Sequence, residues 1–470
     1  MSSPPRATDI SPESPRHRGV EELCEEFVAV CESAVHPLEI AGALEFDGWT
    51  DHALRNSFGA SDVFTLAEVM YRRVPRRPAE PPPQPDLWRT TRWRPALHSL
   101  LYGSPAVCFT AAAGLLAGPG ASTVVIVSLL VSWALSQGLA YLGYLRLGSG
   151  VPGQAERVLL TALSAGLTAV LAAISVVSVV ASAGMPVLIF GVAMGSYMLG
   201  ATVLLVLGAE RQVLLALSPG VLGATAFLLL GRPSHLEHAT WATLSATPLL
   251  AVGLALARTI RAVGPVRWAK LLSVTDVRKA LPSAGFGLVA GGLLLFPVAV
   301  ATPAHGAGSA SALLALLPLT LSMGAAEWLL VWFRRRTQRA MRSTHNLRVF
   351  ASRARLLLAA AVLQYLIMTM LLTAAVLAVV TGSRMLHPHW TTLQQIATYL
   401  TIGCSLFVSL LLNAFDSRIV PVIAGTAALA VEIACHIRRL DNQICVGMVL
   451  LAALAAYAAA VLGSAARHAS

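Results

Sequence analysis

A few ionisable and polar side chains lie inside long apolar stretches of this sequence, where each needs a chemical reason. Glu327, within SMGAAEWLLVWF, is the clearest case, and Glu432 lies in another apolar stretch, close to its expected far interface with water. An ionised group at a bilayer centre costs about 2.5 to 3.5 kcal/mol on insertion scales. Both carboxylates are therefore candidates for a cargo cavity or for coupling to an ion.

Each candidate also has a structural interpretation. Glu327 is able to pair with Arg334 or Arg335, which follow it by seven or eight residues on one helical face. Gln137, in WALSQGLAY, lies at a matching place in the other half of the chain. It suits a shared cavity, but a hydrogen bond between helices explains it almost as well. Three further residues are weaker candidates for lining a cavity, namely Gln364, Asn413 and Tyr197.

The sequence does not favour an enzyme. Catalytic membrane proteins of the cell envelope usually carry carboxylates on substantial outer loops, whereas the outer loops expected here are short. HLEH at 235–238 and HPHW at 387–390 are their clusters with metal-capable side chains, and such alternating histidines are typical of solvated turns. The phosphate-loop, nucleophile-elbow and zinc-protease motifs are absent. We expect no catalytic residue, no bound metal and no cofactor.

The composition indicates that most of the chain lies in lipid. Hydrophobic residues make up 56% of the 470 positions, and charged residues only 12%. Soluble domains carry about 25% charged residues, so this little charge does not cover a water-soluble surface of this size. The net charge of +11 indicates basic loops held against an anionic membrane leaflet, which makes membrane lipids the first expected partner.

Apolar runs of membrane-spanning length recur along most of the chain. A transmembrane helix needs roughly 20 predominantly apolar residues. The pattern predicts twelve spans, at 97–118, 121–145, 158–183, 185–207, 212–231, 240–258, 284–303, 309–333, 355–381, 391–415, 418–437 and 443–463.

The placement of basic residues predicts the orientation of these spans. With the N-terminus inside, eighteen Lys and Arg residues fall on the cytoplasmic connections and four on the opposite ones. Basic residues concentrate on the cytoplasmic side of membrane proteins. Both ends of the chain are therefore expected in the cytoplasm. The Arg438–Arg439 pair lies on the outer side and is the exception to this pattern.

The rest of the chain divides around these spans. Residues 19–78 have helical periodicity and predict a small cytoplasmic helical domain. Its acidic first helix argues against nucleic-acid binding, so we expect it to dock a cytoplasmic protein partner. The full division is a disordered tail at 1–18, the helical domain at 19–78, a Pro-rich linker at 79–96, a first six-helix lobe at 97–258, a cytoplasmic linker at 259–283, a second six-helix lobe at 284–463 and a tail at 464–470.

Two short charged turns interrupt the apolar pattern in the same way, half a chain apart. LLVLGAERQVLLALSPG at 204–220 and LLLNAFDSRIVPVIAG at 410–425 each end one span, pass a few polar residues and begin the next span. Arg211 and Arg418 take corresponding positions, and we expect them in cytoplasmic hairpins that contribute to a gate. The correspondence favours two related lobes, in the plan of two-lobed transporters.

Three of these stretches carry a family resemblance. LLLNAFDSRIVPVIAGTAALAVEIA looks like the hairpin between the tenth and eleventh helices of polysaccharide flippases in the multidrug/oligosaccharidyl-lipid/polysaccharide exporter superfamily. GQAERVLLTALSAGL and VFASRARLLLAAAVL are similar to the entries into their third and ninth helices. The resemblance implies two six-helix lobes around a central cavity that opens alternately to the two membrane faces. It also implies a lipid-linked saccharide or a polysaccharide as cargo.

The sequence therefore predicts an all-α polytopic protein of the bacterial plasma (inner) membrane that exports or flips such a saccharide. Two alternatives remain open. One is a non-transporting membrane scaffold of an envelope or polysaccharide-synthesis complex, which the small docking domain would suit. The other is a small-molecule transporter of the major-facilitator type, although the loop RLGSGVPGQAER lacks the Asp-Arg pair that is usual there.

Overall fold

The chain folds into two compact units in a computed structural model, and each unit is described by itself. They divide between Arg89 and Thr90. The structure describes residues 19–75, 94–116, 120–151, 153–263, 273–301, 317–343, 346–382, 390–415, 417–440 and 442–464. The predicted tail at 1–18, nearly all of the tail at 464–470, most of the linker at 79–96 and part of the linker at 259–283 lie outside these ranges.

The first unit is a bundle of short helices whose ends are set by capping residues. Thr50 and Asp62 each accept a hydrogen bond from the backbone N–H of the third residue of the helix that follows, and Gly59 ends a helix with a φ of +67°. Side-chain acceptors and left-handed glycines are the common signals for helix ends. The helices are α1 (Val20–Glu26), α2 (Val28–Ser33), α3 (Pro37–Phe46), α4 (Asp51–Phe58) and α5 (Val63–Arg73).

The core of this unit is built from one face of each helix. Leu23, Cys31, Leu44 and Met70 are almost fully buried in it. Cys24 joins Cys31 there because seven residues amount to two helical turns, although Phe27 separates α1 from α2. The two thiols are therefore apolar packing groups in this domain.

The second unit contains long, apolar helices, as the composition predicts. They are α6 (Arg94–Gly103), α7 (Pro105–Leu115), α8 (Ala121–Leu147), α9 (Gln154–Val180), α10 (Met185–Val206), α11 (Glu210–Leu229), the short η1 (Ser234–Leu236), α12 (Glu237–Val263), α13 (Val274–Ala301), α15 (Met323–Arg342), α16 (Leu347–Gly382), α17 (Trp390–Ala414), α18 (Ile419–Ile437) and α19 (Gln443–Val461). Ten helices among the described residues are long and apolar enough to cross a membrane. The protein is an all-helical, multi-pass membrane protein.

The other two of the twelve predicted spans have a different form. The span at 97–118 is divided at Ser104 into α6 and α7, since Pro105 has no N–H donor and begins α7. The span at 309–333 lies partly outside the described residues. Its described part is helical at 317–321 and continues through Ser322 into α15, which carries several arginines.

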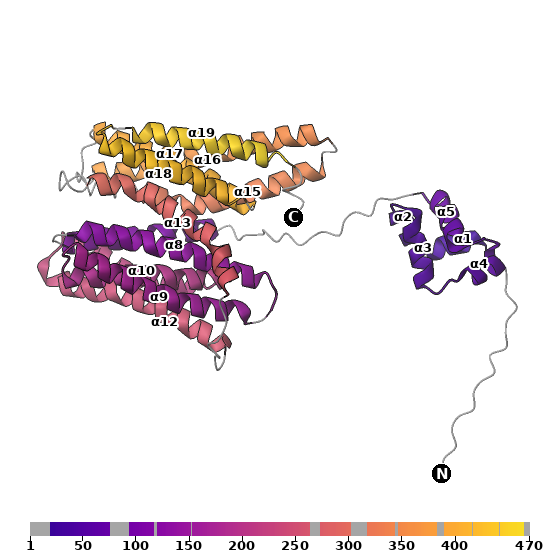
Figure 1. Cartoon of the computed structure of the whole chain (residues 1–470), viewed down its shortest axis with the longest axis horizontal. Helices are drawn as coiled ribbons and strands as arrows, with labels where there is room; N and C mark the ends of the chain where they lie inside the picture. Colours follow the sequence, from indigo (N-terminus) through magenta and orange to yellow (C-terminus); the bar gives the residue numbers. More distant parts are fainter. Residues whose placement is uncertain are drawn as a thin grey trace, which may run out of the picture. The chain divides into compact units, whose positions relative to one another are not determined.

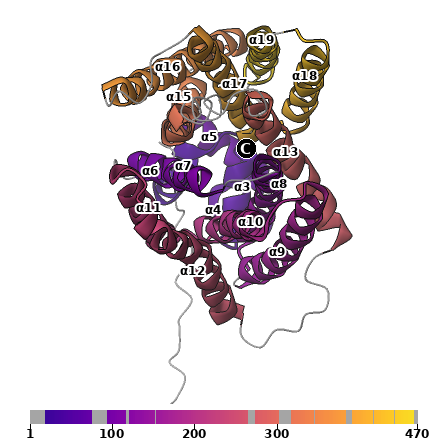
Figure 2. The ribbon, with the colours of Figure 1, turned by 90° about the vertical axis from the view of Figure 1, so that its left-hand side faces the viewer.

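The membrane helices form two lobes that share one packing plan. In the first lobe α10 packs against α8, α9 and α12, while α11 packs against α7 and α12. In the second, α17 packs against α16 and α19, while α18 packs against α13 and α19. We count α6 and α7 together as the first span and α19 as the twelfth. When both helices of a first-lobe pair are replaced by the helices six spans later, most pairs become a packed pair of the second lobe. The two halves of the chain are therefore structural repeats, and Figures 1 and 2 show them as two groups of helices, α8–α12 and α15–α19.

The lobes contact each other mainly through two helix pairs that the repeat also relates. The second span, α8, packs along the seventh, α13, and the first span, α6, packs on the eighth, α15. Close packing of α8 and α13 depends on Gly287, because a Cβ there would lie 2.9 Å from the Trp133 carbonyl oxygen. Figure 1 shows α13 lying between the two groups.

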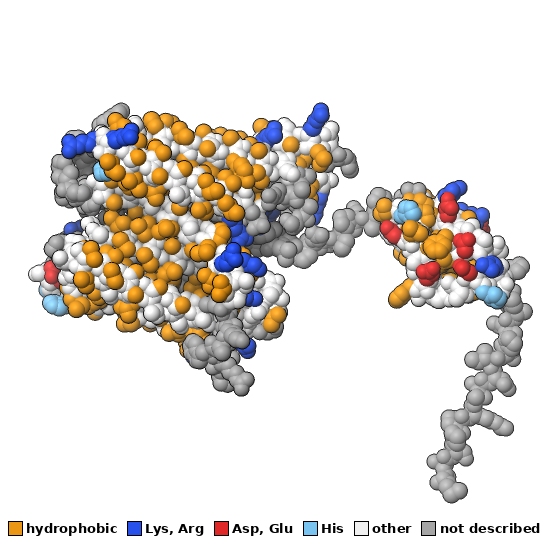
Figure 3. All heavy atoms as spheres, in the orientation of Figure 1, with side chains coloured by type: hydrophobic (Ala, Val, Ile, Leu, Met, Phe, Trp, Pro, Cys, Tyr) orange, Lys and Arg blue, Asp and Glu red, His pale blue; other side chains and the backbone are white. Residues whose placement is uncertain are grey.

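The surface of this unit matches a membrane environment. Large apolar side chains are exposed along its helices, for example Val180, Leu229 and Leu249. Figure 3 shows hydrophobic side chains over the middle of the unit and most of the visible Lys and Arg at one end. We call this the basic end. It is the end where α8, α10, α12, α15 and α17 finish and the next helices begin.

Candidate functional site: polar contacts between the lobes

The first contact between the lobes at the basic end joins α6 to α15. The His98 Nδ1 atom contacts the Glu327 carboxylate, 229 residues away in sequence. His98 is 8% exposed, whereas the Glu327 side chain is 37% exposed. Gly103 allows the close approach, because a Cβ there would collide with Leu321, just before α15. The predicted candidate Glu327 therefore lies at the interface of the lobes.

His98 also contacts the short turn between α10 and α11. Its Nε2 atom lies 3.1 Å from Glu210 Oε1, at ion-pair distance but without the alignment of a hydrogen bond. The Tyr102 ring stands edge-on to the imidazole at 6.1 Å, and Tyr102 interacts with Glu327. An imidazole with a carboxylate beside each nitrogen is arranged to hold a proton on both. This cluster, His98, Glu210 and Glu327, can change its charge by one proton.

The expected ion pair between Glu327 and Arg334 is not formed, because Glu327 contacts His98 and Arg334 turns to the end of α17. Its Nη2 atom donates to the Ala414 carbonyl at the end of α17, and its guanidinium lies 5.2 Å from the Phe415 ring centre. A cation is favourable at a helix C-terminus because the last carbonyls lack helical partners. Arg334 thus fixes the end of α17 to α15.

The second contact between the lobes is a cation–π interaction. The Arg418 guanidinium, in the turn between α17 and α18, lies 4.6 Å from the ring centre of Tyr141 on α8. Arg418 and Glu210 belong to the two corresponding turns of the repeat. Each turn therefore reaches the boundary between lobes at the basic end. Arg211, by contrast, is exposed beside Glu210, so the acid of this turn makes the contact.

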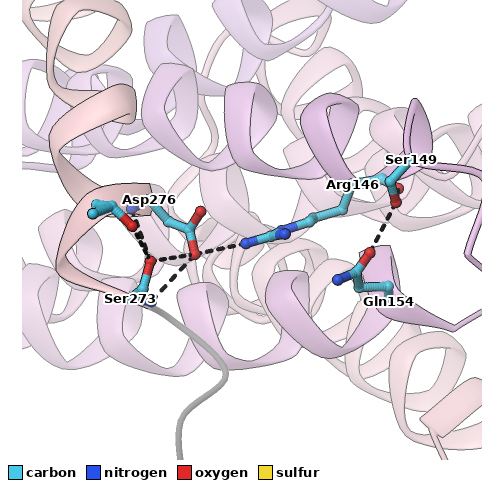
Figure 4. A network of polar contacts seen from close by, with 6 residues as sticks. Arg146, Ser149, Gln154, Ser273 and Asp276 are labelled. Atoms are coloured by element: carbon cyan, nitrogen blue, oxygen red, sulfur yellow. Dashed lines mark hydrogen bonds and ion pairs between the residues drawn. The ribbon is translucent and has the colours of Figure 1, made fainter.

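The third contact joins the end of α8 to the beginning of α13. Arg146 Nη2 lies 2.6 Å from Asp276 Oδ2, which also accepts a hydrogen bond of 2.8 Å from the Ser273 hydroxyl (Figure 4). The Asp276 N–H in turn donates to Ser273 Oγ. This reciprocal pair caps α13 in the manner of a capping box. The aspartate is thereby held in place for Arg146.

A small cavity lies inside the first lobe, away from these contacts. It has a volume of about 40 Å³ and lies among α7, α10, α11 and α12. Its walls are mostly apolar and aromatic, with the Thr247 and Ser245 hydroxyls as polar groups. The predicted candidate Tyr197 is part of its lining and is 5% exposed.

The remaining predicted residues do not gather around one cavity. Gln137 packs against Gly287 of α13, at the boundary of the lobes. Asn413 lies at the end of α17, and Gln364 is partly buried within α16. Glu432 was expected close to water, but this was wrong, because it is only 2% exposed. Residues 425, 429 and 432 share the face of α18 that packs on α13, as Gly425 and Leu429 contact Val289 and Gly292.

Three residues of the lobe contacts were not identified from the sequence. Glu210 and Asp276 lie in the first turns of their helices, where polar residues are ordinary, and His98 is a single polar residue within α6. His98 precedes the Pro105 interruption by seven residues, and only the fold brings it to Glu327. The sequence offers one indirect indication of Glu210, because it adjoins Arg211, the predicted gate residue of the same turn.

No family model matches this chain, and no curated protein matches it. Among solved structures, it is similar to the inward-facing conformation of a multidrug resistance MATE family transporter of the MOP superfamily. The identity is 15% over 80% of this chain and 95% of that one, with a TM-score of 0.46. A mutant of the Vibrio cholerae MATE transporter VcmN is 13% identical over 78% of this chain and 94% of that one, with a TM-score of 0.43. The likeness is distant, and the two-lobe assignment rests on this chain's own helix packing.

Proposed function

We propose that the protein is a membrane transporter whose two lobes give a cargo alternating access to the two membrane faces. The observation that carries this proposal is the set of polar contacts between related lobes at one end of the bundle. Two-lobed repeats around a central axis are the common plan of such transporters. We further propose that the protein lies in a bacterial plasma membrane, with the basic end and both termini in the cytoplasm. The distribution of Lys and Arg supports this orientation.

The contacts between lobes suit a gate at the basic end. Glu327 with His98, Arg418 with Tyr141, and Arg146 with Asp276 all separate if the lobes move apart there. Partly exposed contacts of this kind contribute on the order of 1 kcal/mol each. A total of a few kcal/mol is the size of difference that a ligand or a proton overcomes in a two-state protein.

We propose a lipid-linked saccharide or a polysaccharide as the cargo. The support is the set of sequence patterns at the entries of α9 and α16 and across the turn from α17 to α18. A second candidate is a small apolar or amphipathic molecule. The apolar lining of the cavity at Tyr197, Trp241 and Thr247 favours it, and the cavity would have to widen to hold such a cargo. Residues 19–75 contribute a separate helical domain, for which we propose a cytoplasmic protein partner.

A reversible disulfide between the lobes tests the transport mechanism. A Cβ at Gly138 would lie 3.5 Å from that of Ala284, within the range that a disulfide spans. Gly138→Cys with Ala284→Cys, on a background without the native cysteines, should abolish transport in proteoliposomes when oxidised and regain it on reduction. Each single cysteine variant is the control. Full transport by the oxidised double variant would refute movement of α8 against α13.

Filling the cavity of the first lobe distinguishes the two cargo classes. Ala193 lines the cavity, so Ala193→Phe should fill it completely. The small-molecule cargo would be favoured by two results together. The unmodified protein would flip no saccharide, and Ala193→Phe would lose small-molecule transport. Flipping of a fluorescent lipid-linked saccharide that survives Ala193→Phe would favour the saccharide cargo. Neither activity in proteoliposomes would favour the scaffold alternative.

A further inference from the structure

The basic end contains a hollow beside the ion pair of Arg146 and Asp276 that none of the proposed transport steps uses. It has a volume of about 430 Å³ and lies where α8 ends and where α9 and α13 begin. Its polar lining comes from Arg146, Gln154, Arg157, Ser273, Thr275 and Asp276. Figure 4 shows this network, with Arg146 between Asp276 on one side and the turn that contains Ser149 and Gln154 on the other.

The hydrogen bonds of the hollow leave donors for a ligand. The Gln154 carbonyl oxygen accepts from Ser149 at 2.8 Å, which orients its amide nitrogen as a remaining donor. Arg157 is exposed, and within the described part of the chain its guanidinium has no ion pair. Arg146 uses Nη2 for Asp276, while its Nε has no partner among the described residues. The hollow therefore offers two guanidinium groups against one carboxylate.

The surrounding helices add to this positive character. α9 begins at Gln154 after Gly153, with no side chain capping its first N–H groups. The unsatisfied N–H groups at the start of a helix attract anions. Asp276 opposes an anion, but Arg146 and Ser273 already hold its Oδ2 atom. The balance of charge favours a ligand with a compact anionic group.

We propose that this hollow binds a phosphate group. Guanidinium groups match phosphate oxygens in pairs, and the Gln154 amide donates to a remaining oxygen. The hollow spans helices of both lobes, so a bound phosphate bridges α9 of the first lobe to α13 of the second. It thereby stabilises the arrangement in which the basic end is closed. The phosphate is that of a phospholipid headgroup or a free phosphate.

Binding to the full-length protein tests the proposal with two probes. The first probe is inorganic phosphate, titrated by calorimetry into protein in a neutral, lipid-free detergent. The second is phosphatidylglycerol, whose retention is measured by native mass spectrometry after release from nanodiscs of phosphatidylcholine that contain it. Binding of the lipid alone identifies a headgroup as the source, and binding of inorganic phosphate alone identifies a soluble source.

Three variants test whether the binding of inorganic phosphate or of phosphatidylglycerol takes place in the hollow. Arg157→Gln should weaken binding about tenfold or more, because a charged hydrogen bond is lost while the exposed position leaves folding intact. Asp276→Asn should strengthen it severalfold by removing the opposing charge. Arg278→Gln is the control. Arg278 lies on α13 with Asp276 but outside the hollow, so its loss of charge should leave binding unchanged. The proposal is overturned if neither probe binds, or if Arg157→Gln has no larger effect than Arg278→Gln.

Discussion

His98 of α6 and Glu327 of α15 are in contact although they belong to different lobes. The contact joins the first span to the eighth. Its counterpart in the repeat is the packing of the second span, α8, on the seventh, α13. Glu210 completes the cluster from the turn between α10 and α11. The charge state of one imidazole and two carboxylates therefore contributes directly to how firmly the lobes close.

Removing the charge of Glu327 should weaken this closure. Glu327→Gln is expected to impair transport while membrane insertion stays intact, because the amide no longer neutralises His98. Uptake or flipping in proteoliposomes and the amount of folded protein in the membrane are the two measurements. Glu237→Gln, at the exposed start of α12, is a matched control that should transport normally. Unchanged transport by Glu327→Gln would remove this residue from the gate.

The contact of Arg418 with Tyr141 predicts a difference between two substitutions of the same ring. Tyr141→Ala removes the aromatic face and should favour the open basic end by about 0.5 to 1 kcal/mol. Tyr141→Phe retains the face and should behave like the unchanged protein. Accessibility of a single cysteine introduced at the basic end reports the open population. Equal accessibility in the two variants would show that the ring does not hold Arg418.

Gly287 predicts a packing effect with a clear control. In Gly287→Ala the new methyl group would lie 2.9 Å from the Trp133 carbonyl oxygen and 2.8 Å from Gln137 Cγ. Relief of this overlap should separate α8 from α13 and lower stability by about 1 to 3 kcal/mol. Gly253→Ala meets nothing within 4 Å and should be neutral or slightly stabilising. A thermal unfolding temperature that falls equally in both variants would contradict the close approach.

Cys31 predicts a pH dependence in the small N-terminal domain. Burial, with Cys24 nearby, raises the pKa of the Cys31 thiol from 9.0 to about 11. The folded state favours the neutral thiol, so this contribution to stability is present below pH 9 and is lost as the pH rises through about 11. Alkylation of Cys31 in the folded protein should be about tenfold or more slower than in denaturant, measured by mass spectrometry near neutral pH. Equal rates would show that the thiol is exposed.

The helical architecture could be predicted from the sequence to a large extent because it depends on local signals. Apolar runs of span length and arginines at their ends located the helices, and the resemblance between 204–220 and 410–425 indicated the repeat. Capping by Thr50, Asp62 and Gly59 is equally local. Within the small domain α3 has the weakest local signal, since Pro37 opens it without a strong periodic pattern.

The site was harder to predict because it depends on which distant helix ends meet. Glu327 was recognisable as an acid within an apolar stretch, but its neighbour His98 lies 229 residues away. Glu432 was expected near water from its distance to the end of its span. It is buried instead because its face of α18 packs against α13, and that choice of face is set by tertiary packing.

The central claim is that the two lobes move relative to each other, and distances between spin labels test it most directly. One pair of labels, at Val151 and Ser343, spans the lobes at the basic end, and another, at Leu230 and Leu440, spans them at the opposite end. In proteoliposomes, lowering the pH or adding cargo should lengthen the distances of one pair while shortening those of the other. A single distance distribution in each pair, unchanged under all conditions, would contradict alternating access.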